Sequence, residues 1–209
     1  MPYREDNRFI SPKDKNAKIW RYIPLEELVN LFAKRALFFV RSTLLEDTYE
    51  GTLPSSAYMS AAKAMIESVP IKRSEEEARK TVRQLARDSM LNNLMQRELA
   101  LVNSWNLSND ESAFMWKMYS SNEKGVAIQS TFDKLCRSFT TSQDEPVYVG
   151  QVQYHDFRDG WKGKILGIET IMFKRSSFSC DNEVRALTFL PQEELWSQLE
   201  KLTGQNMDQ

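Results

Sequence analysis

Histidine, cysteine and long hydrophobic runs are all scarce in this chain. Its 209 residues include one histidine, His155, and two cysteines, Cys136 and Cys180. A zinc site of histidine and cysteine therefore lacks ligands, and Ser-His-Asp or Cys-His catalysis would depend on one residue. We expect His155 to be an ordinary surface or core residue. The longest apolar runs, such as residues 36–40, are far too short to cross a bilayer, so we expect no membrane partner.

An excess of charge of one sign is also missing. The formal net charge is -1 at pH 7, so no global basic field attracts nucleic acid or a membrane surface. A hydrophobic fraction of 41% is typical of a globular protein with a substantial core. The two cysteines lie far apart, and we expect no signal peptide, so we expect both thiols to be reduced. These features predict a soluble protein of the cytoplasm.

The strongest catalytic motifs are missing as well. The chain contains no GxxxxGK(S/T) phosphate loop, no HExxH, no paired CxxC and no GxSxG. Each of these motifs would have pointed to one kind of reaction. Function must therefore be argued from weaker constellations of residues.

The first third of the chain predicts a strand, a helix and a second strand. Residues 19–23 are apolar and aromatic and end at Pro24, which suits the first turn of a helix. Apolar residues then recur at helical spacing, which predicts a helix that ends near Arg35. Residues 37–41 predict the next strand.

The middle of the chain predicts helices. An apolar stripe over residues 58–69 indicates one helix. Ser74 and Glu77 have the spacing of a capping box, which predicts the start of a long helix. Ser108 and Glu111 repeat that spacing and predict a further helix behind them.

Strands and helices alternate again in the last third. Residues 126–128 and 147–154 predict strands, residues 165–174 predict a helix, and Pro191 opens a terminal helix. The whole pattern predicts an α+β fold with a central mixed or antiparallel sheet and a helical insertion at residues 54–102. We expect a single domain over residues 17–203, with a flexible arm at 1–16 and a tail at 204–209.

The most informative segment is residues 181–190. In a strand, Asp181, Glu183 and Arg185 share one face with the apolar side chains that follow them. The other face is apolar too, which is typical of a strand inside a sheet. Charged groups at the edge of a core must be paired, neutralised or used for binding or chemistry. These three residues are therefore a candidate site.

Two other groups allow more than one interpretation. Trp116 and Tyr119 are three residues apart on a predicted helix, so their side chains are neighbours. They either pack in the core or form a wall that stacks on a planar ligand. Asp47 and Glu50 follow a predicted strand, where they belong either to a solvated turn or to a ligand or metal site.

Seven blocks of sequence resemble one bacterial family, the domain-of-unknown-function family numbered 2971. The blocks are residues 20–22, 45–51, 104–105, 111–119, 124–130, 173–175 and 183–186. The resemblance makes Glu183 and Arg185 motif positions but implies little about function. The chain departs from the family at Asp181, where relatives often have glutamate, and in residues 46–48, where an Asn-Asp-Pro-like turn is expected.

The leading hypothesis is an enzyme that resembles the ADP-ribosyltransferases and uses NAD as its substrate. Those enzymes place a basic residue early, an aromatic residue in the middle and a glutamate late. Arg21, Tyr119 or Trp116, and Glu183 follow this order. Arg21 would hold the pyrophosphate and the aromatic residue would stack on nicotinamide. Glu183 would stabilise the oxocarbenium-like ribose, and Asp181 would orient a protein or nucleic-acid acceptor.

Two other hypotheses remain open. In a nuclease or phosphoesterase, four carboxylates would bind Mg²⁺ while Lys174 or Arg185 binds a phosphate. In a noncatalytic sensor, Glu183 would form a buried pair with Arg21 or Arg185. The catalytic candidates are Glu183, Asp181 and Tyr119, the ligand-binding candidates are Arg21, Tyr22, Trp116, Lys174, Arg185, Asp47 and Glu50, and no metal site is assigned. A small enzyme of the first kind would fit a toxin or a phage-defence effector.

Overall fold

The chain folds around one antiparallel sheet of six strands, in the order β4-β1-β3-β8-β5 with β2 beside β3. The computed structural model describes residues 2–71, 74–119, 124–140, 145–159, 167–191 and 193–194. The strands of the sheet are β1 (Lys18–Pro24), β2 (Val40–Arg41), β3 (Ala100–Leu107), β4 (Gly125–Thr131), β5 (Tyr148–Gln151) and β8 (Glu183–Phe189). A separate parallel pair is formed by β6 (Gln153–His155) and β7 (Phe173–Arg175). The predicted α+β class is confirmed, with an antiparallel main sheet.

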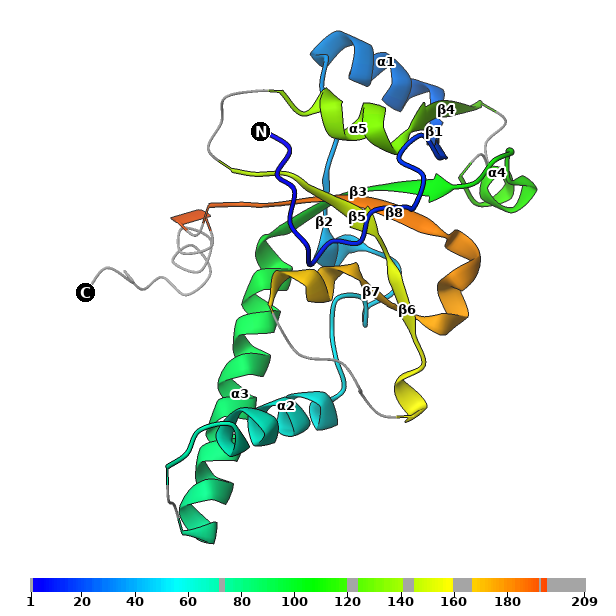
Figure 1. Cartoon of the computed structure of the whole chain (residues 1–209). Coiled ribbons are helices and arrows are strands. Elements are labelled where there is room, and N and C mark those ends of the chain that lie inside the picture. Colours follow the sequence, from blue (N-terminus) through cyan, green and yellow to red (C-terminus); the bar gives the residue numbers. More distant parts are fainter. Residues whose placement is uncertain are drawn as a thin grey trace.

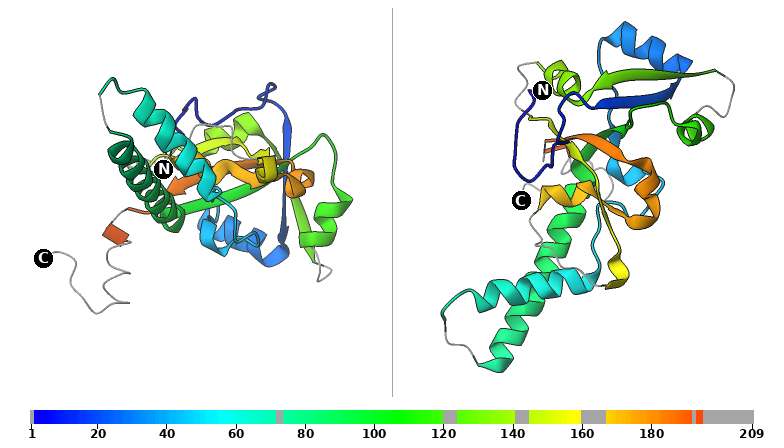
Figure 2. Two further views of the ribbon diagram at one scale, coloured as in Figure 1. Left: turned by 90° about the horizontal axis from the view of Figure 1, so that it is seen from below. Right: turned by 45° about the vertical axis from the view of Figure 1, so that its right-hand side comes forward.

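Four of the five α-helices in the described residues fall into two groups in space, and the fifth, α4 (Ala113–Tyr119), lies apart from both (Figure 1). The α-helices are α1 (Leu25–Lys34), α2 (Ser55–Glu67), α3 (Glu75–Leu99), α4 (Ala113–Tyr119) and α5 (Phe132–Ser138). Short 3₁₀ helices are η1 (Ser42–Leu44), η2 (Phe157–Asp159), η3 (Ile168–Met172) and η4 (Ser176–Asp181). In Figure 1, α1 and α5 lie on one side of the sheet. Figure 2 shows that α2 and α3 form a hairpin that projects away from it, which confirms the helical insertion predicted in mid-chain.

The sheet is buried on both faces. On one face, Ile19, Trp105 and Val184 pack with Phe132 and Leu135 of α5. On the opposite face, a second cluster contains Phe9, Ala100, Val102, Tyr148, Ile171, Met172 and Leu187. Strand β8 supplies residues to both clusters and lies between β3 and β5. The prediction that this strand is buried inside a sheet is therefore correct.

The two predicted capping boxes had opposite outcomes. The Ser74 hydroxyl accepts a hydrogen bond from the Glu77 backbone N–H, and the Glu77 carboxylate accepts one from the Ser74 N–H. That capping box opens α3 as predicted. The box predicted at Ser108 and Glu111 is wrong, because α4 begins at Ala113 and Ser112 Oγ accepts the hydrogen bond from the Met115 N–H. Side-chain spacing does not reveal where the backbone turns into the helix.

Several strands and helices begin or end at other residues than predicted, because packing against distant parts of the chain determines their limits. The strand predicted at 37–41 is reduced to Val40–Arg41, and the one predicted at 147–154 is divided into β5 and β6. The predicted helix at 165–174 is wrong at its end, because η3 leads directly into β7. Its first residues, and the terminal helix beyond residue 194, lie outside the described residues.

Residues 2–16 run along the sheet although their composition is polar. Phe9 is buried, and its ring stacks on Tyr148 of β5 with 4.8 Å between centroids. A Cβ atom at Gly150 would lie 3.0 Å from Phe9 Cβ, so the glycine allows this close approach. One buried aromatic side chain therefore anchors a segment whose other residues are mostly polar.

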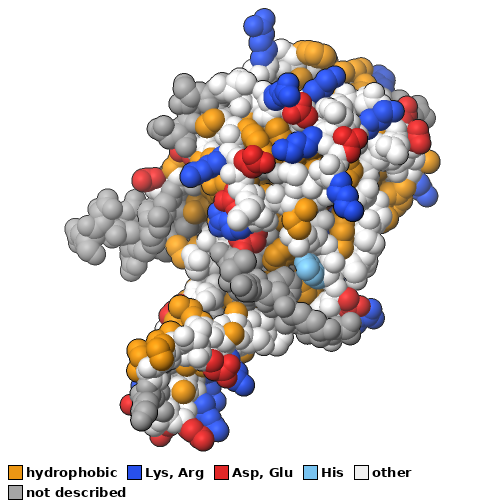
Figure 3. Space-filling view, in the orientation of Figure 1, with side chains coloured by type: hydrophobic (Ala, Val, Ile, Leu, Met, Phe, Trp, Pro, Cys, Tyr) orange, Lys and Arg blue, Asp and Glu red, His pale blue; other side chains and the backbone are white. Residues whose placement is uncertain are grey.

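Charged side chains of both signs are interspersed over the face seen in Figure 3, as the balanced net charge implies. Within the described ranges, no helix has the length and apolar character needed to cross a membrane. Cys136 is buried and Cys180 is exposed, and both are free thiols. His155 is half-buried, and its ring packs edge-on against Phe173.

Candidate functional site

The site begins where two neighbouring strands separate. Strand β1 pairs with β3 at Ile19 and Trp20, and from Arg21 to Pro24 its pairing continues with β4. The guanidinium of Arg21 crosses to β3 and donates a hydrogen bond from Nη1 to the Ser104 carbonyl oxygen at 2.9 Å. A cavity of about 560 Å³ lies beside this separation and is lined by residues of both strands. Its volume falls within the range of about 300–1,000 Å³ that is typical of small-molecule sites.

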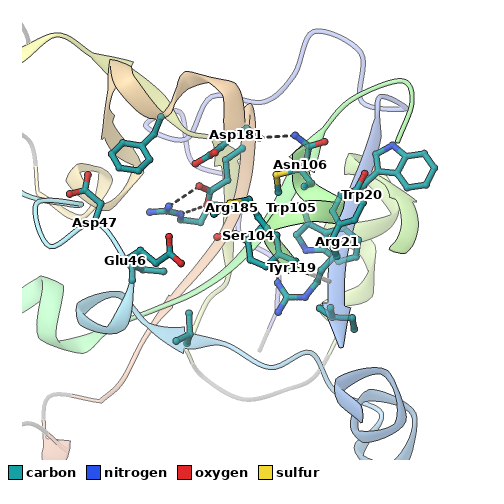
Figure 4. Close-up of a pocket in the computed structure, with 18 of the residues that line it drawn as sticks. Trp20, Arg21, Glu46, Asp47, Ser104, Trp105, Asn106, Tyr119, Asp181 and Arg185 are labelled. Atoms are coloured by element: carbon teal, nitrogen blue, oxygen red, sulfur yellow. Dashed lines mark hydrogen bonds and ion pairs between the residues drawn. The ribbon is translucent and has the colours of Figure 1, made fainter. Parts of the chain in front are cut away.

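Most residues predicted for the site line this one cavity. The predicted residues in its wall are Arg21, Tyr22, Asp47, Glu50, Tyr119, Lys174, Asp181, Glu183 and Arg185. Figure 4 shows Arg21 and Tyr119 across the pocket from Asp181 and Arg185. Trp116 is placed elsewhere: its ring packs edge-on against Tyr22 at 5.2 Å, and its Nε1 donates to Glu111 Oε2. Trp116 therefore supports the wall through Tyr22 without lining the cavity.

Glu183 and Arg185 form a buried ion pair in the cavity wall. Arg185 Nε lies 2.7 Å from Glu183 Oε1, and Arg185 Nη2 lies 3.0 Å from Glu183 Oε2. The same Nη2 donates to Glu50 Oε1, and Nη1 donates to the Ile171 carbonyl oxygen. The guanidinium is 1% exposed, so these contacts replace its lost hydration.

Lys174 connects the remaining carboxylates to this pair. Its Nζ lies 2.7 Å from Asp181 Oδ2, 3.4 Å from Glu183 Oε2 and 3.6 Å from Glu50 Oε1. We refer to Glu50, Lys174, Asp181, Glu183 and Arg185 as the ion cluster. Its three carboxylates and two cations sum to one negative charge. Asp181 is the most exposed carboxylate of the three, with 22% of its side chain accessible.

The electrostatics of the ion cluster favour the charged forms. Burial acts to raise the pKa of Glu183, but the positive charges of Arg185 and Lys174 outweigh it and hold that pKa at about 2. Burial acts to lower the pKa of Lys174, yet the charges of Glu183 and Glu50 raise it. Glu183 is therefore ionised and Lys174 protonated at neutral pH.

The opposite wall of the cavity contains a cation, Arg21. Burial lowers the pKa of the Arg21 guanidinium, with a smaller opposing effect from Glu27. Among the described residues, no carboxylate lies within ion-pair distance of Arg21. Among the described residues its guanidinium donates one hydrogen bond, to the Ser104 carbonyl oxygen, although it carries five N–H donors. This is an arrangement that suits an anionic ligand.

Tyr119 lines the same cavity, and charges of the ion cluster act on its hydroxyl group. Burial raises the pKa of its hydroxyl, and the charges of Glu183 and Asp181 raise it further. Its side chain is 54% exposed although it lines the cavity. A neutral phenol in this position presents a ring face and one hydroxyl group to a ligand.

Asp47 lines the cavity and forms an ion pair with Arg175. Its carboxylate binds Arg175 by two hydrogen bonds, of 3.0 Å from Nε and 2.8 Å from Nη2. The Arg175 guanidinium in turn lies over the rings of Tyr49 and Phe178, at 5.3 and 5.2 Å from their centroids. Asp47 therefore orients Arg175 and is not part of the ion cluster.

The carboxylates of the ion cluster are arranged around a lysine and not around a metal site. In the part of the chain that the structure describes, no group of three or more histidine, cysteine, aspartate or glutamate residues is arranged to hold one. Lys174 Nζ occupies the point where Asp181, Glu183 and Glu50 converge. A cation of the protein stands where Mg²⁺ would have to bind.

Several residues that line the cavity, including residues of β3, are not among the predicted site residues. Ser104 and Asn106 line the cavity, and Asn106 Nδ2 donates to the Asp181 carbonyl oxygen at 2.7 Å. Trp20, Glu46 and Phe178 also line it. Residues after 100 alternate with the period of a strand, but they follow directly on a long helix, and the predicted helical insertion extends to residue 102.

The fold and the cavity define a class: an α+β protein with a charged pocket at the point where two strands of its sheet separate. Residues 115–186 match the model of the family described as Protein of unknown function (DUF2971), which confirms the resemblance seen in the sequence. The matched segment includes Tyr119, Lys174, Asp181, Glu183 and Arg185. No curated protein and no solved structure matches the chain.

Proposed function

We propose that the cavity binds a nucleotide and that the protein is an ADP-ribosyltransferase-like enzyme with NAD as its substrate. The observation that carries this proposal is Arg21, a half-buried guanidinium in the cavity wall that pairs with no described carboxylate. Burying a charge without a partner is unfavourable unless a ligand supplies one. A pyrophosphate would do so by two parallel hydrogen bonds to the guanidinium.

The remaining walls suit the rest of such a ligand. Tyr119 and Phe178 provide ring faces for a base, and Asp181 provides a partly accessible carboxylate. In the proposed reaction the C–N glycosidic bond of NAD breaks, and its electron pair leaves with nicotinamide. The carboxylates of Glu183 and Asp181 stabilise the positive ribose until an acceptor nucleophile adds to it and loses its proton to solvent.

One observation favours a second candidate, a noncatalytic nucleotide sensor. Both oxygens of Glu183 already accept hydrogen bonds from Arg185, and Lys174 is close to one of them. A carboxylate held in this way has a structural role whether or not a reaction takes place beside it.

The test is a combined binding and turnover experiment on purified protein. Calorimetry with NAD measures binding, and chromatography measures released nicotinamide. Wild type should bind NAD and consume it, Arg21→Met should lose binding, and Asp181→Asn should bind but turn over more slowly. Arg79→Met, an exposed arginine of α3, is the matched control and should behave as wild type. Binding without turnover would support the sensor, and no binding by wild type would overturn both candidates.

The wider role follows from the same chemistry. An enzyme that consumes NAD or modifies a protein or nucleic acid in the bacterial cytoplasm would suit a toxin or a phage-defence effector. Expression in a bacterial host should slow growth and lower cellular NAD, and Asp181→Asn should relieve both effects. Unchanged growth and NAD with active protein present would contradict this role.

A further inference from the structure

A second cavity adjoins the first on the side of α1. It has a volume of about 340 Å³ and shares Arg21, Ile23, Glu27 and Phe38 with the larger cavity. Arg21 is therefore at the junction of two compartments, with the separation of β1 and β3 beside it. Two adjacent compartments with shared wall residues suit a ligand with two bulky ends.

One face of α1 forms a wall of the second cavity. Glu27, Asn30, Leu31 and Lys34 line it, and their spacing of three, four and seven residues places them on the same side of the helix. Ile23, Leu37 and Phe38 supply apolar surface. Apolar walls with a few polar groups are typical of a pocket that binds a heterocyclic ring and hydrogen-bonds its edge.

Phe38 forms the boundary between the compartments. Its side chain is 71% exposed, which is unfavourable for a phenyl ring, although it lines both cavities. Its backbone is held in place, because Asn103 Nδ2 donates to the Phe38 carbonyl oxygen at 2.7 Å. A ring that stacks on Phe38 would cover this surface at little entropic cost.

We propose that the second cavity binds the second base of a dinucleotide, whose pyrophosphate lies at Arg21 and whose first base lies in the larger cavity. This inference rests on the nucleotide binding proposed above and adds the site of the ligand's second base. Two ring-binding compartments on either side of one guanidinium match two bases joined by a diphosphate. Glu27 at the junction would accept hydrogen bonds from ribose hydroxyls.

Leu31→Trp tests the proposal because it fills the second cavity from the face of α1. Val29→Trp is the matched control: it places the same indole on the same helix, at a position that is 59% exposed and does not line the cavity. Thermal unfolding of both variants confirms that they are folded. Calorimetry then compares NAD with nicotinamide mononucleotide and AMP.

Wild type and Val29→Trp should bind NAD about tenfold or more tightly than either mononucleotide. Leu31→Trp should lose about tenfold in NAD affinity and retain binding of one mononucleotide in the larger cavity. Equal NAD affinity in Leu31→Trp and wild type would overturn the second compartment and leave the proposed function standing. Failure of wild type to bind any of the three nucleotides would overturn both.

Discussion

Glu183 and Arg185 stand two residues apart on β8, and their side chains meet in two contacts of 2.7 and 3.0 Å on the same face of the strand. The alternation of a strand makes this meeting possible, because residues i and i+2 point the same way. Burial makes it necessary, because little of either side chain is accessible to water. The pair fixes one wall of the cavity before any ligand binds.

Glu183→Gln should destabilise the protein strongly. The substitution removes one of the two carboxylate charges that pair with the buried Arg185 guanidinium. Breaking a buried pair costs about 3–5 kcal/mol. Urea unfolding followed by tryptophan fluorescence measures the change. Glu75→Gln in the exposed pair with Arg79 is the control and should leave the unfolding midpoint unchanged. A similar midpoint for both variants would show that Glu183 has no structural role.

The same carboxylate predicts the response of stability to acid. Its pKa is lowered to about 2 in the folded protein, below the value of about 4.3 for an unfolded glutamate. Its stabilising contribution is therefore complete above about pH 4.3 and is lost as pH falls toward 2. The free energy of unfolding, measured between pH 6 and pH 2.5, should fall more steeply in wild type than in Glu183→Gln. Parallel profiles would contradict the assignment.

Arg21→Met should change ligand response more than stability. The variant removes a half-buried charge that has no described carboxylate partner, and it also removes one hydrogen bond to Ser104. These two effects oppose each other, so the change should stay within about 1 kcal/mol. Pyrophosphate should raise the melting temperature of wild type, because a ligand that binds the folded state stabilises it. The variant should show no such rise. An equal rise in melting temperature in both proteins would show that pyrophosphate does not bind at Arg21.

A buried hydrogen-bond chain holds the helical hairpin to the sheet domain. Tyr58 donates to Asn93 Oδ1 at 2.8 Å, and Asn93 Nδ2 donates to Thr170 Oγ1 at 2.5 Å. Tyr58→Phe leaves Asn93 Oδ1 without that donor and should cost about 1–3 kcal/mol of unfolding free energy. Thr81→Ala, which removes an exposed hydroxyl from α3, should have little effect on the same measurement.

The two capping-box sequences give a matched pair of substitutions. Ser74→Ala should destabilise α3 by about 1 kcal/mol, because its hydroxyl accepts the Glu77 N–H. Ser108→Ala should have a smaller effect, because α4 begins after Ser112. Hydrogen exchange at the first turn of each helix distinguishes the two. An equal loss of protection from exchange in the two variants would show that Ser108 caps α4.

Local sequence patterns were sufficient for the elements whose signals are short-range. The capping box at Ser74, the strand ending at Pro24 and the two faces of β8 all depend on neighbours within a few residues. Strand β3 was missed because its alternation begins directly after a long helix, at Ala100. The partners of Asp47 and Glu50 could not be inferred, since Arg175 and Arg185 lie more than a hundred residues further along the chain.

The sequence by itself determined the α+β class, the helical insertion and the charged face of β8, because periodicity, caps and strand alternation are local physical constraints. The tertiary structure alone decided where β1 leaves β3, which charges neutralise one another, and that Arg21 faces the cavity without a described carboxylate partner. These features depend on how distant segments pack and exclude water. Burial sets the energetic cost of each charge, and burial exists only once the chain has folded.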